Sequence, residues 1–274
     1  MTQSTTRPVA IGELQRAWHA VQAGEFRGRA SSRSRVRTEH ADPRWAPRER
    51  VLPVVGCHPQ AGASTLAVAI ATAAAPARVI ECSSATATGL ATAAIAELGT
   101  SAGGWRLGRR GQIEMARGIE VLVTPREVPL PEEAAGAIGL SVLDVGWELG
   151  QVMASPAWLR EAITAAPTVV VATTATTPGL RRLENALTML APARPLVAVL
   201  GPARRRWPRH LEASLGPLSA QASSAARVTC IPTDKTLAER GMTGAALPAS
   251  LHRAAQALLE QIALGLDFTE GTPQ

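Results

Sequence analysis

The stretch that decides the fold is VLPVVGCHPQAGASTLAVAIATAA, residues 51–74. Its first residues are apolar and rich in Val, which is typical of a strand buried on both faces of a sheet. A loop, CHPQAGA, comes next, and the Ala-rich run that begins with Ser64 and Thr65 is expected to form a helix. A strand, a glycine-containing loop and a helix start in this order are typical of a phosphate-binding loop, because backbone N–H groups at the helix start can surround an anion.

The residue that this loop lacks is a lysine. A phosphate-binding loop normally carries a lysine that reaches the outer phosphates, followed by a Ser or Thr that holds Mg²⁺. Here Ala63 precedes Ser64, and the whole chain has one lysine, Lys235. Three interpretations are open: a working nucleotide site, a damaged one, or a plain strand–turn–helix unit in which Ser64 and Thr65 only favour the start of a helix.

Short runs rich in Val and Ile recur along the chain and alternate with helical patterns. The runs span residues 51–56, 78–82, 119–124, 140–144, 168–173, 196–201 and 227–231. Helices are expected at 64–74, 88–98, 158–165, 179–190, 208–215 and 248–264. This alternation predicts an α/β domain with a doubly wound, mostly parallel sheet of about seven strands. The Gly- and Arg-rich residues 99–118 are expected to form an irregular loop.

Charge and composition divide the chain into three parts. Residues 1–50 hold ten Arg against five acids, whereas residues 51–274 hold 18 basic against 17 acidic side chains. We expect a basic, mostly disordered arm with a short helix at 1–50, a domain at 51–265 and a disordered tail at 266–274. No apolar run is long enough for a transmembrane helix, no signal peptide is evident, and the three cysteines lack metal-ligand spacing, so a reducing cytoplasm is expected.

The loop GCHPQAGASTLAVAIA resembles the deviant P-loop of the ParA/MinD family of dimeric ATPases, which runs G-x-K-G-G-x-G-K-[ST]-[ST]. On this resemblance Ala63 replaces the P-loop lysine, and His58 replaces the signature lysine that acts across the dimer. Pro59 and Gln60 replace two glycines, and Pro59 removes a backbone donor. The positions of the implied vestigial nucleotide site in this loop are His58, Gly62, Ala63, Ser64 and Thr65.

Further segments follow in the order expected for this family. SVLDVGWELG resembles the strand that leads into switch II, with Asp144 on the Mg²⁺-associated carboxylate and Gly146 after it. Ser83 falls where the family has an Asp that orients water, and Gly201 where it has an Asn near adenine. The IPTD turn at 231–234 resembles the end of the last strand. The chain is also similar to an actinobacterial plasmid and conjugative-element subgroup with an H-x-x-A-G-x-S-T-L loop and a D-V-G-W segment.

The resemblance implies a P-loop fold with an eroded nucleotide site. It implies ATP and Mg²⁺ as ligands, bound weakly or not at all, with Ser64 and Asp144 as the magnesium ligands and no catalytic residue. Two lost cations and a lost carboxylate remove most of the charge stabilisation on which phosphoryl transfer depends. The function expected is a non-hydrolysing scaffold or regulator in plasmid or chromosome partition or in conjugative DNA transfer, which acts with a protein partner or as a homodimer.

Two alternatives stay open on the sequence alone. One is an unusual but active ATPase of the same fold. The other is a DNA-binding accessory protein whose basic arm makes non-specific contacts with phosphates. The candidate nucleic-acid contacts are Arg33, Arg35 and Arg37 in the arm and Arg204, Arg205, Arg206 and Arg209 in the segment GPARRRWPRH.

Overall fold

The computed structural model of the protein describes residues 44–270 except 85, 88 and 192, and for residues 264–270 it gives the backbone alone. The strands are β1 (Arg50–Gly56), β2 (Ala77–Ser83), β3 (Ala96–Thr100), β4 (Trp105–Arg110), β5 (Ile113–Gly118), β6 (Leu140–Gly146), β7 (Val170–Thr174), β8 (Leu196–Leu200) and β9 (Val228–Ile231). The α-helices are α2 (Ala63–Ala73), α3 (Leu149–Ala154), α4 (Trp158–Ala165), α5 (Thr177–Met189), α6 (Arg209–Glu212), α7 (Pro217–Ser224), α8 (Lys235–Arg240) and α9 (Ala249–Glu270). Two short 3₁₀ helices are η1 (Pro125–Glu127) and η2 (Arg204–Arg206).

The strands form one sheet in the order β3-β4-β5-β2-β6-β1-β7-β8-β9. All neighbours from β5 to β9 pair in parallel, while β3–β4 and β4–β5 pair antiparallel. Strand β1 lies between β6 and β7, with Val54 opposite both Asp144 and Val170. The prediction of a doubly wound, mostly parallel α/β sheet is therefore confirmed, and the carboxyl ends of β1, β6 and β7 meet at one edge.

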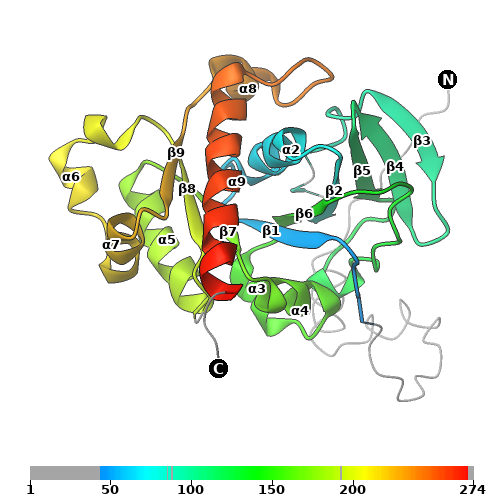
Figure 1. The fold of residues 1–274 in the computed structure, drawn as a ribbon, viewed down its shortest axis with the longest axis horizontal. Coiled ribbons are helices and arrows are strands. Elements are labelled where there is room, and N and C mark those ends of the chain that lie inside the picture. Colours follow the sequence, from blue (N-terminus) through cyan, green and yellow to red (C-terminus); the bar gives the residue numbers. More distant parts are fainter. Residues whose placement is uncertain (1–43, 85, 88, 192, 271–274) are drawn as a thin grey trace, which may run out of the picture. The chain divides into compact units, whose positions relative to one another are not determined.

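Helices cover both faces of this sheet and bury two separate hydrophobic cores (Figure 1). Helices α2 and α9 pack on one face, where α2 contributes Leu66 and Ile70, and α9 contributes Leu258. Helices α3, α4, α5 and α7 pack on the other face, where Trp158 is among the buried side chains. Because both faces are covered, the central strands are apolar at nearly every position, which is the pattern that made them recognisable in the sequence.

The region from residue 88 to 118 differs from its prediction. No helix forms at 89–98, and residues 99–118 are not an irregular loop, since this region contains the antiparallel strands β3, β4 and β5. Gly104 and Gly111 lie at the turns between these strands, with φ of 89° and 59°, whereas Gly99, Gly108 and Gly118 lie within the strands themselves. The sheet consequently has nine strands in the described part of the chain rather than about seven.

The strand predicted at 119–124 is also wrong. The paired strand β5 ends at Gly118, and residues 119–124 lie outside it. Val121 and Val123 are 74% and 73% exposed, so this Val-rich run is not buried as the pattern suggested. The other six predicted strands coincide with β1, β2, β6, β7, β8 and β9 to within two residues at each end.

A buried arginine joins the starts of three strands. Arg78 on β2, which is 3% exposed, donates hydrogen bonds to Glu49 Oε1 (2.8 Å), Ser141 Oγ (3.2 Å) and the Glu132 carbonyl oxygen (2.6 Å). Burial alone raises the pKa of Glu49, but the hydrogen bond from Ser141 and the Arg78 guanidinium outweigh it, so that the pKa is lowered. The ion pair therefore fixes the chain before β1 to the sheet.

Replacing Arg78 by Met is expected to lower the free energy of unfolding by about 3–5 kcal/mol, because Glu49 would be left buried without its cation. The control is Arg48→Met, which removes an ion pair with Glu133 whose side chains are 87% and 81% exposed, and should cost less than about 1 kcal/mol. Urea denaturation of both variants measures the difference. Equal effects would show that Arg78 does not hold the start of the sheet.

Most of the predicted basic arm, including its short helix, falls on residues 1–43, which lie outside the residues that the structure describes. Arg33, Arg35 and Arg37 also lie outside the described residues. Within residues 44–270, no helix combines the length and apolar character needed to cross a membrane.

Candidate nucleotide site at the carboxyl edge of the sheet

The loop at residues 57–62 leaves β1 at this edge and enters α2. Its backbone takes up left-handed conformations at Gln60 (φ 63°) and Gly62 (φ 85°). The positive φ of Gly62 favours glycine, and a Cβ there would also lie a close 3.3 Å from Leu200 Cδ2. Helix α2 has no side-chain cap at its N-terminus. Its first backbone N–H groups are therefore available to an anion, as the sequence predicted.

A buried carboxylate lies beside this helix start. Asp144, near the end of β6, is 1% exposed, and neither of its oxygens has a hydrogen-bond partner among the described residues. Burial raises the pKa of Asp144 to about 7; the nearby Ser64 hydroxyl lowers it, although without a well-formed hydrogen bond, and the charge of Glu81 raises it. The predicted pair of Ser64 and Asp144 is thus brought together, but part of Asp144 is protonated near neutral pH.

Glu81 is a site residue that the sequence analysis did not single out. It lies opposite Asp144 on the neighbouring strand β2 and is 5% exposed. Its Oε1 accepts hydrogen bonds from the backbone N–H groups of Gly89 (3.0 Å) and Leu90 (3.1 Å). A charged residue within the apolar run RVIEC was the available signal. Glu81 therefore adds a second carboxylate to the neighbourhood of Asp144.

The chain after β2 packs closely around the same place. A Cβ at Gly89 would lie 3.8 Å from the Ser64 side chain, and a Cβ at Gly146 would lie 2.5 Å from that of Ser83. The predicted residue Gly146 is therefore required by close packing against the end of β2. Ser83 is 7% exposed and stands where the resemblance places the water-orienting Asp. Its short side chain carries no charge with which to orient water.

Both ring nitrogens of His58 contact oxygen atoms of the same chain. Its Nε2 lies 3.2 Å from Thr174 Oγ1 at the end of β7, and its Nδ1 lies 2.8 Å from the carbonyl oxygen of Pro59. Thr174 in turn lies 3.0 Å from Thr176 Oγ1, the N-cap of α5. The residue on the position of the signature lysine thus joins the loop to α5.

Three basic side chains that could replace the missing lysines are engaged in contacts of their own. Lys235 is 87% exposed on α8 and pairs with Glu239 at 3.6 Å. Arg110 is buried and donates to the carbonyl oxygens of Ala93 (2.9 Å) and Thr243 (2.6 Å). Arg117, on the neighbouring strand β5, lies opposite Glu81 and pairs with Glu97 on β3. The described charges that act on Asp144 therefore come from a carboxylate and not from a cation.

The position expected to contact adenine is closed to side chains. Gly201, just after β8, has φ of 152°, and a Cβ there would lie 2.5 Å from that of Ala175. The Asn that the family carries at this place could not be accommodated without a shift of the backbone.

Asp144 and Ser64 fit a magnesium ion in ligand type. An unpartnered carboxylate and a hydroxyl are hard oxygen donors, and Mg²⁺ is commonly held by one or two carboxylates together with phosphate oxygens. When bound, the ion would offset phosphate charge. The proton on Asp144 must leave before a cation can bind, so the raised pKa weakens this site at neutral pH. No group of three His, Cys, Asp or Glu side chains in the described part of the chain could hold a metal.

No protein-family model matches the sequence, and no curated protein matches it. The fold, in contrast, is shared with solved structures. One is a protein of Borrelia burgdorferi B31, described as a plasmid partition protein and bound to AMPPNP, with 11% identity, a TM-score of 0.52 and coverage of 79% of this chain and 99% of that chain. Another is McdA of Cyanothece in the apo form, with 12% identity, a TM-score of 0.53 and coverage of 78% and 100%. The chain therefore has the fold of the ParA/MinD family of P-loop ATPases.

Proposed function

We propose that the chain is a ParA/MinD-like P-loop protein with an eroded nucleotide site, which acts as a non-hydrolysing scaffold or regulator. The charge at the carboxyl edge is the observation that carries this proposal. Asp144 is buried beside Glu81, Ala63 supplies no cation, and no basic side chain in the described part of the chain contributes to the pKa of Asp144. Where a working site presents lysines, this chain has Ala63 and His58, so no cation at these two positions offsets the charge of a triphosphate next to Asp144 and Glu81.

Two other features support the loss of hydrolysis. Pro59 lacks a backbone N–H, so the loop offers one donor fewer to phosphate. Ser83, packed against Gly146, cannot take the role of a carboxylate toward water. Phosphoryl transfer depends on positioning and charge rather than on covalent chemistry by the protein, so both losses act on the rate.

The biological setting that we propose is plasmid or chromosome partition or conjugative DNA transfer. It is supported by the resemblance of the loop and by the shared fold with the Borrelia protein described as a plasmid partition protein. A scaffold of this kind would act through a protein partner or a second copy of itself. Mg·ATP, where it binds, would bind weakly.

An unusual active ATPase is the second candidate. It is favoured by the uncapped start of α2 and by the placement of Ser64 beside Asp144, which retain part of a phosphate and magnesium site. AMPPNP in the Borrelia structure shows that the fold can hold a nucleotide in that protein. Phosphate release separates the two candidates.

Replacing Ala63 by Lys is expected to strengthen Mg·ATP binding by about 1–2 kcal/mol, the scale of a charged hydrogen bond, without producing turnover. The lysine restores one cation, but Pro59, His58 and Ser83 are unchanged. When several groups act together in catalysis, restoring one of them recovers little of the rate. Phosphate release and calorimetry measure the two effects. Ala238→Lys, the same exchange on exposed α8, is the control and should change neither.

Turnover by the Ala63→Lys variant at a rate of about 1 s⁻¹ or more, within the range of ordinary enzymes, would show that the site lacks a single residue. In that case the other changes in the loop would not be defects, and the chain would be an ATPase that lost one side chain.

A further inference from the structure

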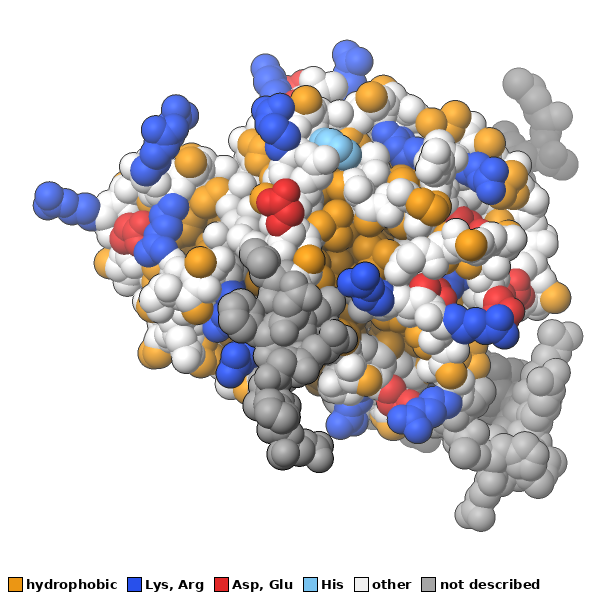
Figure 2. Space-filling view, in the orientation of Figure 1, with side chains coloured by type: hydrophobic (Ala, Val, Ile, Leu, Met, Phe, Trp, Pro, Cys, Tyr) orange, Lys and Arg blue, Asp and Glu red, His pale blue; other side chains and the backbone are white. Residues whose placement is uncertain are grey.

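A small basic projection follows β8 at the carboxyl edge of the sheet. We call residues 202–214 the α6 knob; they contain η2 and α6 and lie at the far left of Figure 1. The knob has four Arg and one acidic residue, Glu212, which leaves an excess of three positive charges. Over α6, Figure 2 shows Lys or Arg side chains that project from the surface around an acidic one.

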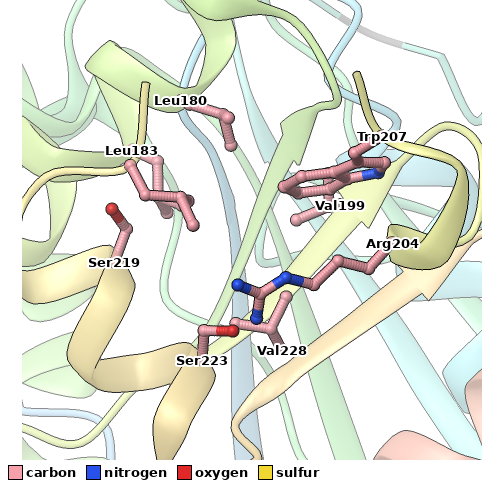
Figure 3. A pocket seen from close by; sticks show the side chains of 9 residues that line it. Leu180, Leu183, Val199, Arg204, Trp207, Ser219, Ser223 and Val228 are labelled. Carbon is pink, nitrogen blue, oxygen red and sulfur yellow. The ribbon is translucent and has the colours of Figure 1, made fainter. Parts of the chain in front are cut away.

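The underside of the knob is anchored to the domain. Trp207 is 9% exposed, and its Nε1 donates to the carbonyl oxygen of Pro202 at 2.9 Å. Figure 3 shows Trp207 together with Leu180 and Leu183 of α5 around a cavity of about 10 Å³, which leaves room for no more than one water molecule. Trp207 therefore anchors the turn that carries the arginines to the domain.

One of the four arginines is already used within the knob. Arg204 Nε and Nη2 donate to Glu212 Oε1 (3.0 Å) and Oε2 (2.9 Å), a bidentate pair that raises the pKa of Arg204 and lowers that of Glu212. This pair joins η2 to α6 and neutralises the only carboxylate of the knob. It also shows that a guanidinium on this turn can bind a carboxylate side-on.

The other three arginines are unpaired. Arg205, Arg206 and Arg209 are exposed, and none makes a hydrogen bond or ion pair with any residue between 44 and 270 that the structure describes. Three guanidinium groups on one anchored turn, with no acid of the knob left to neutralise them, form a compact basic patch that can attract anions.

We propose that the α6 knob docks an acidic segment, rich in Asp and Glu, of a partner protein. Planar guanidinium groups bind carboxylates through two parallel hydrogen bonds, as Arg204 already does with Glu212. The proposal deepens the scaffold function and rests on it, because it names the chemistry of the partner that a scaffold needs. The docking test uses no nucleotide, so a negative result would overturn the docking proposal and leave the proposal of an eroded nucleotide site unaffected.

A nucleic acid fits the knob less well than an acidic protein segment. Residues 51–274 carry 18 basic against 17 acidic side chains, so this part of the chain has little net positive charge with which to attract a polyanion. Trp207 is buried and offers no ring on which a base could stack. Three phosphate contacts alone would give weak, strongly salt-dependent binding.

The test compares two variants of the full chain with equal loss of charge. The knob variant is Arg205→Gln/Arg206→Gln/Arg209→Gln. The control is Arg160→Gln/Arg240→Gln/Arg253→Gln, three exposed arginines on α4, α8 and α9. The probes are a fluorescent synthetic peptide that alternates Glu and Asp with Ser, the same peptide with Gln and Asn, and a short DNA duplex. Anisotropy is read at low ionic strength and in rising salt.

The full chain is expected to bind the acidic peptide and not the amide peptide. The knob variant should bind it about tenfold more weakly, the scale of three exposed ion pairs, while the control changes less than about twofold. No binding by the full chain, or an equal loss in both variants, would overturn the proposal. Loss of DNA binding in the knob variant without any peptide binding would also overturn it and assign the knob to nucleic acid.

Discussion

Replacement of Asp144 by Asn is expected to stabilise the folded chain at neutral and higher pH, with a gain that vanishes in acid. Burial raises the pKa of Asp144 to about 7, whereas a carboxyl in the unfolded chain titrates near 4. Between these values the unfolded state releases its proton while the folded state keeps it, so the stability of the native protein falls as pH rises. The cost is absent below about pH 4 and complete above about pH 7, because both states are protonated at the lower limit.

The size of the expected change in the free energy of unfolding follows from the difference between the pKa of Asp144 in the folded chain and that of a carboxyl in the unfolded chain. From pH 5 to pH 8, the free energy of unfolding of the native chain relative to that of Asp144→Asn should fall by about 2–3 kcal/mol. Urea denaturation of both proteins at several pH values gives this difference, and groups common to both cancel. The control is Asp234→Asn, which keeps an N-cap that accepts a hydrogen bond from Leu237 N, and should change stability by less than about 0.5 kcal/mol at pH 7.

A difference that stays constant with pH would show that Asp144 is ionised in the folded protein throughout this range. A cation would then have to be close to it, and the carboxyl edge would be nearer to a working magnesium site than we infer. The experiment therefore bears on the function as well as on stability.

The central sheet could be predicted because its signals are local. Val51–Val55 form an apolar run that ends at a glycine, and the helix start at Ser64 follows within a loop of ordinary length. Both faces of these strands are covered, so their hydrophobic character does not depend on which neighbour they find. The same holds for β6 and β7, whose carboxyl ends complete the site.

The antiparallel strands β3–β5 could not be predicted in the same way. Arg110 and Arg117 look like loop residues, yet both are buried, because their guanidinium groups find carbonyl oxygens and Glu97 in segments distant along the chain. Gly104 and Gly111 mark hairpin turns rather than an open loop. These partners exist only once the fold has formed, so a charged, glycine-rich run gave no sign of a strand.

The candidate site also has a part that could be predicted from the sequence and a part that could not. The sequence predicted Ser64 and Asp144 as a pair, and the structure brings them together. It could not predict that Glu81 lies beside Asp144 across two strands, or that the chain at Gly89 packs near Ser64. Burial and a neighbouring charge set the pKa of Asp144, and both are properties of the assembled sheet.

The second large effect that we expect is weak binding of Mg·ATP. A P-loop site with both lysines is expected to hold nucleotide through several charge-assisted hydrogen bonds, each about 1.5–3 kcal/mol. This chain has Ala63 and His58 at those positions, Pro59 lacks a donor, and Asp144 carries a raised pKa. The loss of two such bonds weakens binding by at least a hundredfold, and the remaining defects add to it.

Calorimetric titration of the full chain with Mg·ATP near pH 7.5 tests the eroded site most directly. The predicted result is no saturable binding below about a millimolar concentration of ligand, and no thermal stabilisation beyond about 1 kcal/mol at that concentration. A dissociation constant below about a micromolar would contradict the eroded site and show that the chain is a nucleotide-binding protein of this fold.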